Sequence, residues 1–437
     1  MITTNTYEVP SFNALPETSK ELMISVPGSK SITNRALLLA MLANGKSTLS
    51  GILFSDDSRN FIHCLEQLKF DTMIQETTKT GTITGLGGKL PCSEAYLQVG
   101  SAGTAARFLS AVLGISKGSF HMDASMQMRK RPMAPLLNAL RELGCSISFD
   151  EKEDHFPFTL EANGFRTDQI TIDIDKSSQF LSGLLIAAPL AGNEFTIHTI
   201  GTHGMAYIQM TIKMMQQFGV NVFQPDPHTF VIPANQQYTP LNYAIEPDVS
   251  AACYFYAMAA ILGISVTVKG VHKDSLQGDI HFLDVLTEMG CTSQDTTAGI
   301  RLTGPTGGKL KGIEANLSGC SDQAITLAAI APFADSPVTI QGIGHIRHQE
   351  SDRIAAIVHN LTTMGIRCEE TDSSVTIYPG TVHAASIATF DDHRLAMGFS
   401  LPGLLVKGIE IENPACCRKT FEDYFEVLED ALIQLKN

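Results

Sequence analysis

The segment ALRELG, residues 139–144, closes a predicted helix, and the same ending recurs along the chain. Four of the five endings finish on glycine, which a left-handed helix C-cap favours. A repeat this long predicts similar structural units arranged one after another. The other endings, spaced by 71 to 75 residues, are CLEQLK (64–69), MMQQFG (214–219), VLTEMG (285–290) and NLTTMG (360–365).

A second series lies in the other phase of the repeat, where a small or acidic residue precedes an apolar helix. Short β-branched segments such as SVTVKG (265–270) separate the helices, so the sequence predicts an α/β chain of six units, divided into two domains of three. The six helices of this series are KSITNRALLLAML (30–42), GTAARFLSAVL (103–113), SSQFLSGLLIAA (177–188), VSAACYFYAMAA (249–260), SDQAITLAAIA (321–331) and DDHRLAMGFSL (391–401).

The charge balance narrows the classes of partner. The 437 residues carry 31 basic and 45 acidic side chains, a net charge of −14. This balance argues against nucleic-acid or anionic-membrane partners, which need a basic face. The uncharged run 249–268 is long enough to cross a bilayer, but it splits into an alanine-rich helix and a β-branched strand. We therefore predict a buried α/β unit there.

Compartment can be inferred from cysteine usage and from the N-terminal segment. The first 20 residues lack the pattern of a signal or transit peptide. The nine cysteines are odd in number and lack C-x-x-C spacing, which disfavours a disulfide framework or a zinc site. We expect a cytoplasmic protein.

The starts of the second-series helices are the candidate binding positions. We predict that each begins with Ser, Thr or Asp, which cap a helix and leave its first N–H groups directed outward. For any single helix, capping alone is the simpler interpretation, and a single basic residue is a surface charge. Together they favour a receptor for phosphate and carboxylate groups. The basic residues beside the starts are Lys30, Arg35, Arg107, Arg131, Arg353, Arg394 and Lys419.

Two carboxylates lie in the same neighbourhoods and are candidates for proton transfer. Asp322 opens the fifth helix of the series, and Glu350 lies just before Arg353. The alternatives are an N-cap role for Asp322 and an arginine partner role for Glu350, and the sequence leaves these equally open. We expect His345, His348 and His393 to form hydrogen bonds rather than bind a metal, since no third ligand is spaced with them.

Eight segments resemble, in order and spacing, motifs of the 5-enolpyruvylshikimate-3-phosphate synthase family of enolpyruvyl transferases. The resemblance implies two similar domains of three βαβαββ units each, an inside-out α/β barrel with helices inside and sheets outside. One domain would be 28–245 and the other 1–27 plus 246–437. The segments are VPGSKSITNRALLLA (26–40), GSAGTAARFL (100–109), MRKRPMAPLL (128–137), SSQFLSGLLIAAPLA (177–191), GDIHFLDVLTEMG (278–290), QESDRI (349–354), DDHRLAMGFSL (391–401) and KTFEDYF (419–425).

The implied reaction moves the enolpyruvyl group of phosphoenolpyruvate to the 5-hydroxyl of shikimate 3-phosphate and releases inorganic phosphate, by addition and elimination. It belongs to the shikimate pathway of aromatic amino-acid synthesis. The resemblance implies no metal or organic cofactor, and we expect a monomer that closes its two domains over the substrates.

The resemblance also implies a role for individual residues. Asp322 would accept the proton of the 5-hydroxyl, Glu350 would protonate the methylene carbon, and Lys30 would touch both substrates. Gly103 would lie against phosphoenolpyruvate, whose phosphate and carboxylate would be bound by Arg131, Arg353, Arg394 and Lys419. The shikimate 3-phosphate ligands, most of them in 28–245, would be Ser31, Arg35, Ser177, Ser178, Gln179 and Tyr207, with Gln179 reaching both substrates.

Some positions depart from the family pattern. Gln349 stands where the family commonly has Lys, a loss of charge that would weaken substrate binding by a few kcal/mol unless His348 or Arg347 substitutes for it. Gly204 stands where a serine would help to hold the 3-phosphate, and His345 stands where the family has Asn. By their positions in the motifs, His345 and Gln349 would still be substrate-binding residues, as would Asp322.

Two other readings compete. The enolpyruvyl transferase that acts on a UDP-amino sugar typically has Lys-Asn where this chain has Lys30-Ser31, and a loop cysteine that is absent between Cys92 and Cys145. A non-catalytic anion-binding relative would have no need of both Asp322 and Glu350.

Overall fold

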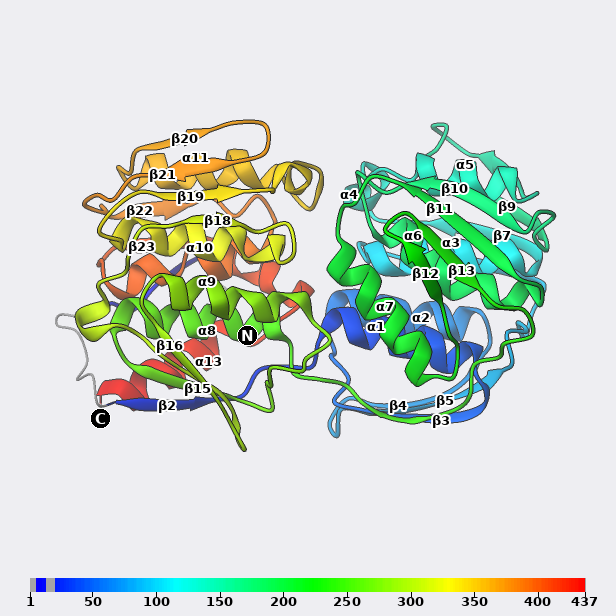
Figure 1. The fold of residues 1–437 in the computed structure, drawn as a ribbon, viewed down its shortest axis with the longest axis horizontal. Coiled ribbons are helices and arrows are strands. Elements are labelled where there is room, and N and C mark those ends of the chain that lie inside the picture. Colours follow the sequence, from blue (N-terminus) through cyan, green and yellow to red (C-terminus); the bar gives the residue numbers. More distant parts are fainter. Residues whose placement is uncertain (1–4, 13–19, 437) are drawn as a thin grey trace. The chain divides into compact units, whose positions relative to one another are not determined.

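The chain forms two compact units in a computed structural model that describes residues 5–12 and 20–436 (Figure 1). The inserted unit is Gly28–Ile245. The terminal unit combines the chain up to Pro27 with the chain from Glu246 onward. The polypeptide therefore leaves the terminal unit after Pro27 and returns to it at Glu246.

Three four-stranded sheets form the outside of the inserted unit, all of whose residues are described. Their strand orders are β14-β3-β5-β4, β6-β7-β9-β8 and β10-β11-β13-β12. In each sheet the first two strands are parallel and the other neighbours are antiparallel. The strands are β3 (Asn44–Ser50), β4 (Asp71–Gln75), β5 (Thr80–Leu86), β6 (Glu94–Gln98), β7 (Lys117–Asp123), β8 (Ser146–Phe149), β9 (Phe158–Asn163), β10 (Gln169–Asp173), β11 (Phe195–Ile200), β12 (Phe223–Asp226), β13 (Thr229–Ile232) and β14 (Asn242–Ala244).

Helices fill the inside of this unit. Every residue of α3 is buried, which suits a helix that is mostly apolar. The helices α1 and α6 are buried over almost their whole length. The amphipathic helices α2, α5 and α7 bury one face each. The bounds are α1 (Lys30–Leu42), α2 (Asp56–Gln67), α3 (Gly103–Ile115), α4 (Met126–Arg129), α5 (Ala134–Glu142), α6 (Gln179–Ala187), η1 (Ala188–Ala191) and α7 (Met205–Gln217).

The terminal unit repeats this plan. Its described sheets have the orders β2-β15-β17-β16, β18-β19-β21-β20 and β1-β23-β22. The strands are β1 (Thr6–Glu8), β2 (Glu21–Ile24), β15 (Ser265–Lys269), β16 (Thr292–Thr296), β17 (Gly299–Thr303), β18 (Glu314–Asn316), β19 (Val338–Gln341), β20 (Cys368–Glu370), β21 (Val375–Ile377), β22 (Ala385–Ile387) and β23 (Ile409–Glu412).

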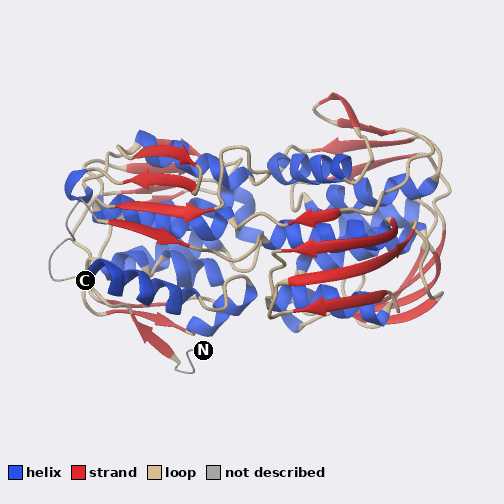
Figure 2. Cartoon of the chain, turned by 90° about the horizontal axis from the view of Figure 1, so that it is seen from below, coloured by secondary structure: helices blue, strands red, loops and turns tan. Residues whose placement is uncertain are grey.

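Helices α8, α10 and α12 are buried inside the terminal unit. In Figure 2 the strands of each unit lie outside its helices, so the predicted inside-out α/β arrangement is confirmed. The helices are α8 (Val249–Leu262), η2 (Gly278–His281), α9 (Phe282–Glu288), η3 (Thr306–Gly308), η4 (Ser321–Gln323), α10 (Ala324–Ile330), η5 (Ala331–Phe333), η6 (Gly344–His348), α11 (Arg353–Thr363), α12 (His393–Gly398), η7 (Leu401–Leu404), η8 (Pro414–Lys419) and α13 (Tyr424–Lys436).

The helix endings that revealed the repeat do adopt the left-handed conformation. Gly144, Gly219, Gly290 and Gly365 all have positive φ angles, and Lys69 does too, with φ of 64°. The sixth repeat departs from the others, because its described sheet has three strands and borrows antiparallel β1 from the N-terminal segment.

Strands from distant parts of the sequence also complete two further sheets. β2 pairs in parallel with β15, and β14 pairs in parallel with β3. The uncharged run 249–268 forms α8 and then most of β15, as predicted. No helix among the described residues is long and apolar enough to span a bilayer.

The prediction of a capping Ser, Thr or Asp at every second-series helix is wrong for three of the six. Ser29, Asp248 and Asp392 do accept a hydrogen bond from the first turn of α1, α8 and α12. The residues at the starts of α3, α6 and η4 are Ala102, Ser178 and Cys320, and none makes a side-chain cap.

Candidate active site

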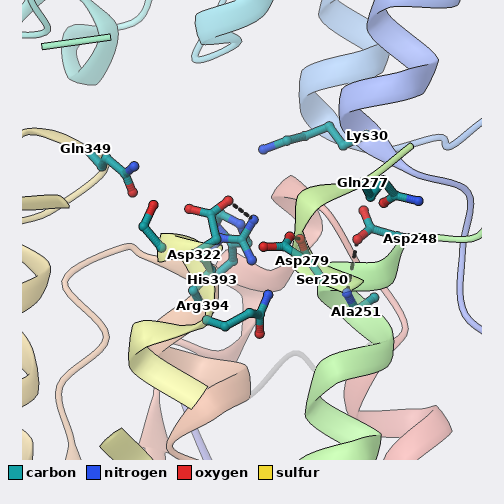
Figure 3. A network of polar contacts seen from close by, with 12 residues as sticks. Lys30, Asp248, Ser250, Ala251, Gln277, Asp279, Asp322, Gln349, His393 and Arg394 are labelled. Atoms are coloured by element: carbon teal, nitrogen blue, oxygen red, sulfur yellow. Dashed lines mark hydrogen bonds and ion pairs between the residues drawn. The ribbon is translucent and has the colours of Figure 1, made fainter. Parts of the chain in front are cut away.

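Six charged side chains of the terminal unit form one ion-pair network, here called the acid–base cluster. Figure 3 shows two of them, Asp322 and Arg394. These side chains lie at or near the starts of buried helices or in short 3-10 helices. Asp322 lies in η4 ahead of α10, Glu350 lies just before α11, and Asp392 is the N-cap of α12. The cations are Arg353 at the start of α11, Arg394 in α12 and Lys419 at the end of η8.

Arg353 is the centre of the acid–base cluster. Its side chain is 1% exposed, and its Nη1 lies 3.0 Å from Asp322 Oδ1. Its Nη2 lies 3.0 Å from Glu350 Oε2, and its Nε lies 2.7 Å from Asp392 Oδ2. Burial alone lowers the pKa of Arg353, but the carboxylates of Asp392, Glu350 and Asp322 outweigh it and raise that pKa overall. Arg353 therefore stays charged and fixes three carboxylates.

Each predicted acid–base carboxylate is held between two cations. Asp322 Oδ2 lies 2.6 Å from Arg394 Nη2, in addition to its contact with Arg353. Glu350 Oε1 lies 3.2 Å from Lys419 Nζ, in addition to its contact with Arg353. The N-cap alternative for Asp322 is wrong, because Cys320 occupies that position. The arginine-partner alternative for Glu350 is correct as a description of its contacts.

In the inserted unit, Lys30 lies at the first position of α1. Its Nζ lies 3.6 Å from Asp57 Oδ2 in α2, and Ser101 Oγ donates to Asp57 Oδ1 over 3.4 Å. Asp57 is 3% exposed. Sequence reasoning missed this carboxylate, although it follows Ser55, which forms a capping box with Ser58 at the start of α2.

Arg35 joins α1 to α7. Its Nε donates to Thr211 Oγ1 over 2.8 Å, and its guanidinium also donates to the backbone oxygens of Ser31 and Tyr207. The guanidinium lies over the Phe108 ring at 5.1 Å. Burial lowers the pKa of Arg35 to about 10. These contacts fix Ser31 and Tyr207 on neighbouring helices.

Gly103 allows three polar side chains to meet at the start of α3. A Cβ at this position would lie 2.7 Å from Arg107 Nη1, 2.9 Å from Arg131 Nη1 and 3.3 Å from Gln179 Oε1. Arg107 Nη1 donates to Gln179 Oε1 over 2.7 Å. Gly103 is therefore required for this close approach. Arg131 and Gln179 were predicted here from the sequence.

Ser178 and Gly204 lie at the starts of α6 and α7, and they approach closely. A Cβ on Gly204 would lie 2.5 Å from Ser178 Oγ, and Gly204 has φ of 67°. Ser177 Oγ accepts from the backbone N–H of Gln179 over 3.3 Å. With Tyr207 in the first turn of α7, the structure brings the predicted 3-phosphate ligands together within one unit.

Comparison with known proteins identifies the family. The family model of EPSP synthase (3-phosphoshikimate 1-carboxyvinyltransferase) matches residues 17–428. The chain belongs to the EPSP synthase family. It is 42% identical to the 3-phosphoshikimate 1-carboxyvinyltransferase of Nostoc punctiforme over 422 residues, covering 96% of this chain and 98% of that protein. It is 39% identical to that of Vibrio atlanticus over 412 residues, covering 93% and 96%.

A solved structure agrees on the fold. The EPSP synthase of Acinetobacter baumannii aligns with a TM-score of 0.82 and 24% identity, covering 98% of each chain. EPSP synthases are transferases, and the family catalyses enolpyruvyl transfer from phosphoenolpyruvate to shikimate 3-phosphate in the shikimate pathway.

At one departure from the EPSP synthase pattern, Gln349, the structure shows what the new residue contacts. Gln349 accepts a hydrogen bond from Arg353, so it extends the acid–base cluster. Arg347 pairs with Asp352 at 3.0 Å and with Glu370 at 2.9 Å. Of the two residues that could substitute for the family lysine, Arg347 is thus already paired with two carboxylates.

A second departure, His345, contacts the residue that precedes Asp322. His345 Nε2 lies 2.8 Å from Ser321 Oγ, next to Asp322 in η4. No group of His, Cys, Asp and Glu side chains suited to hold a metal ion occurs in the described part of the EPSP synthase chain.

Proposed function

We propose that this chain transfers the enolpyruvyl group of phosphoenolpyruvate to the 5-hydroxyl of shikimate 3-phosphate and releases inorganic phosphate by addition and elimination. The observation that carries the proposal is the acid–base cluster, in which Asp322 and Glu350 each contact two cations. Membership of the EPSP synthase family supplies the substrates.

The contacts suggest how binding prepares the carboxylates. Arg394 and Lys419 pair with Asp322 and Glu350 in the structure. The phosphate and carboxylate of phosphoenolpyruvate would compete for the same cations. Losing a cation raises the proton affinity of a carboxylate, so bound substrate would make Asp322 a stronger base and would let Glu350 hold the proton that it then donates.

We assign the proton of the 5-hydroxyl to Asp322 and protonation of the methylene carbon to Glu350. Arg353 keeps Asp392 as a partner throughout, so it would remain charged while it binds the substrate carboxylate. Most shikimate 3-phosphate ligands belong to the inserted unit in this proposal, and most phosphoenolpyruvate ligands to the terminal unit. The inserted-unit ligands are Lys30, Ser31, Arg35, Gly103, Arg131, Ser177, Ser178, Gln179 and Tyr207.

We also propose a cytoplasmic location. All nine cysteines lie in the described residues and are free thiols, which suits a reducing compartment.

Phosphate release tests the function. The purified chain with phosphoenolpyruvate should release phosphate with shikimate 3-phosphate and not with UDP-N-acetylglucosamine. Asp322→Asn and Glu350→Gln should each lower kcat by about 100-fold or more while ligand binding persists. Glu369→Gln, which alters an exposed carboxylate of the same unit, is the control and should keep normal turnover. Equal phosphate release by wild type and both cluster variants would refute the assignment.

A further inference from the structure

Asp279 is a buried carboxyl outside the acid–base cluster, and none of the roles assigned above uses it. It lies in η2 and is 5% exposed. Its Oδ2 accepts a hydrogen bond from Ser250 Oγ in the first turn of α8. Its Oδ1 has no hydrogen-bond partner among the described residues. A buried carboxylate with one unpaired oxygen is costly, whereas a protonated carboxyl avoids most of that cost.

The surroundings of Asp279 carry mostly negative groups. Burial and the carboxylates of Asp322 and Asp248 raise its pKa, Arg394 and the Ser250 hydroxyl lower it, and the net result is a pKa of about 7. Figure 3 shows Asp279 between Asp322 and Asp248. The thiols of Cys253 and Cys320 also lie close enough to interact with Asp279. Burial raises the pKa of both thiols, so they are neutral.

The charge balance of the neighbouring acid–base cluster explains why the protonation state of Asp279 affects anion binding. The acid–base cluster holds three carboxylates and three cations. An ionised Asp279 would add a fourth negative charge beside Asp322 and Arg394. It would compete with an incoming anion for Arg394 and would repel that anion.

We propose that Asp279 is a positioning residue which carries a proton while phosphoenolpyruvate binds, and that its ionisation weakens binding by drawing on the charge of Arg394. This inference rests on the proposed function, since it places an anionic substrate at Arg394. Two features decide the protonation state of Asp279. The hydrogen bond from Ser250 favours the ionised form, and the unpaired Oδ1 disfavours it.

Substrate binding across pH is the first test. Calorimetry would follow phosphoenolpyruvate binding from about pH 6 to about pH 8.5, where an acid of raised pKa loses its proton. Relative to Asp279→Asn, which cannot ionise, wild type should lose affinity by about tenfold over this range. At saturating phosphoenolpyruvate, kcat should be similar in the two proteins. Parallel loss of affinity in both proteins would overturn the proposal.

Ser250→Ala guards against a misfolded Asp279→Asn. Removing the hydroxyl removes a contact that favours the ionised form, so the loss of affinity should move to higher pH. Glu369→Gln is the matched control and should follow wild type. An unchanged midpoint in Ser250→Ala would contradict the proposed role of Asp279.

Infrared difference spectra read the proton without substrate. Wild type minus Asp279→Asn should show the carbonyl band of a protonated carboxyl at about pH 6 that disappears by about pH 8.5. Absence of the band at the lower pH would overturn the proposal, even in an active enzyme. If the band and the binding shift both appear but no phosphate is released, the inference on Asp279 stands and the proposed function fails.

Discussion

Restoring the family serine at position 204 should harm this protein rather than improve it. Gly204 has φ of 67°, where a residue with a Cβ costs about 1–2 kcal/mol. The new Cβ would also lie 2.5 Å from Ser178 Oγ and 2.7 Å from Ser178 Cβ. Ser178 is 5% exposed, so it must shift inside a packed region, at a cost of about 1–3 kcal/mol. Gly204→Ser should therefore lower the free energy of unfolding by about 2–5 kcal/mol.

Gly192 provides a matched control in the same unit. Its φ of 78° is also left-handed, but a Cβ there meets nothing within 4 Å. Gly192→Ser should thus cost only the backbone share, about 1–2 kcal/mol. Urea unfolding followed by far-ultraviolet circular dichroism suits a chain that contains no tryptophan. Equal losses in Gly204→Ser and Gly192→Ser would refute the argument that Ser178 is displaced.

The same variant separates two effects on binding. Gly204→Ser adds the hydroxyl that the family uses, but it displaces Ser178, a proposed ligand of the 3-phosphate. We expect the KM for shikimate 3-phosphate to rise. The double variant Gly204→Ser with Ser178→Gly removes the clash and should recover about 1–3 kcal/mol of the lost stability. If the double variant is no more stable than Gly204→Ser, the loss of stability does not come from a clash with Ser178.

Three further predictions follow from buried polar groups. Arg353→Lys cannot hold three carboxylates at once and should lower the free energy of unfolding by about 3–5 kcal/mol in urea titrations. Thr104→Val removes the 2.5 Å hydrogen bond from Asn34 Nδ2 and should cost about 1–3 kcal/mol by the same assay. For Asp279, whose folded pKa is raised to about 7, the folded state binds more protons than the unfolded state between about pH 4 and about pH 7. Wild type should therefore lose stability relative to Asp279→Asn as the pH rises through that window, and the difference should level off above it.

Each of these has a result that would contradict it. Arg353→Lys as stable as wild type would mean that the lysine and water satisfy the carboxylates. A neutral Thr104→Val would mean that Asn34 finds another acceptor. A constant stability difference across pH for Asp279→Asn would mean that Asp279 has an ordinary pKa.

Local signals explain what the sequence predicted well. The helix endings could be predicted because Gly144 and its counterparts adopt a conformation that glycine favours for local reasons. Lys69 adopts the same conformation without being glycine, and only its place in the repeat revealed it. Asp322 and Glu350 were predicted from their motifs, but their contacts with Arg394 and Lys419 depend on packing between elements distant in sequence.

Other features had no local signal. Asp57 meets Lys30 only because α1 and α2 pack together, and a carboxylate near a helix start reads as a capping residue. From the sequence, Arg347 is one of two possible substitutes for the family lysine, yet in the structure it pairs with Glu370 of β20. The third strand of the last sheet comes from Thr6–Glu8, and no sequence pattern near the sixth repeat predicts this pairing.

The order in which the chain is made adds a consequence to the pairing of β2 with β15. On the ribosome, β2 emerges early, but its partner emerges only after the whole inserted unit, some 240 residues later. At about 5–20 residues per second, β2 waits on the order of 10–50 s for that partner. The inserted unit is complete before the terminal unit can close its first sheet. A nascent chain stalled once Ile245 has emerged from the ribosome should thus hold one finished unit behind an N-terminal strand that is still unpaired.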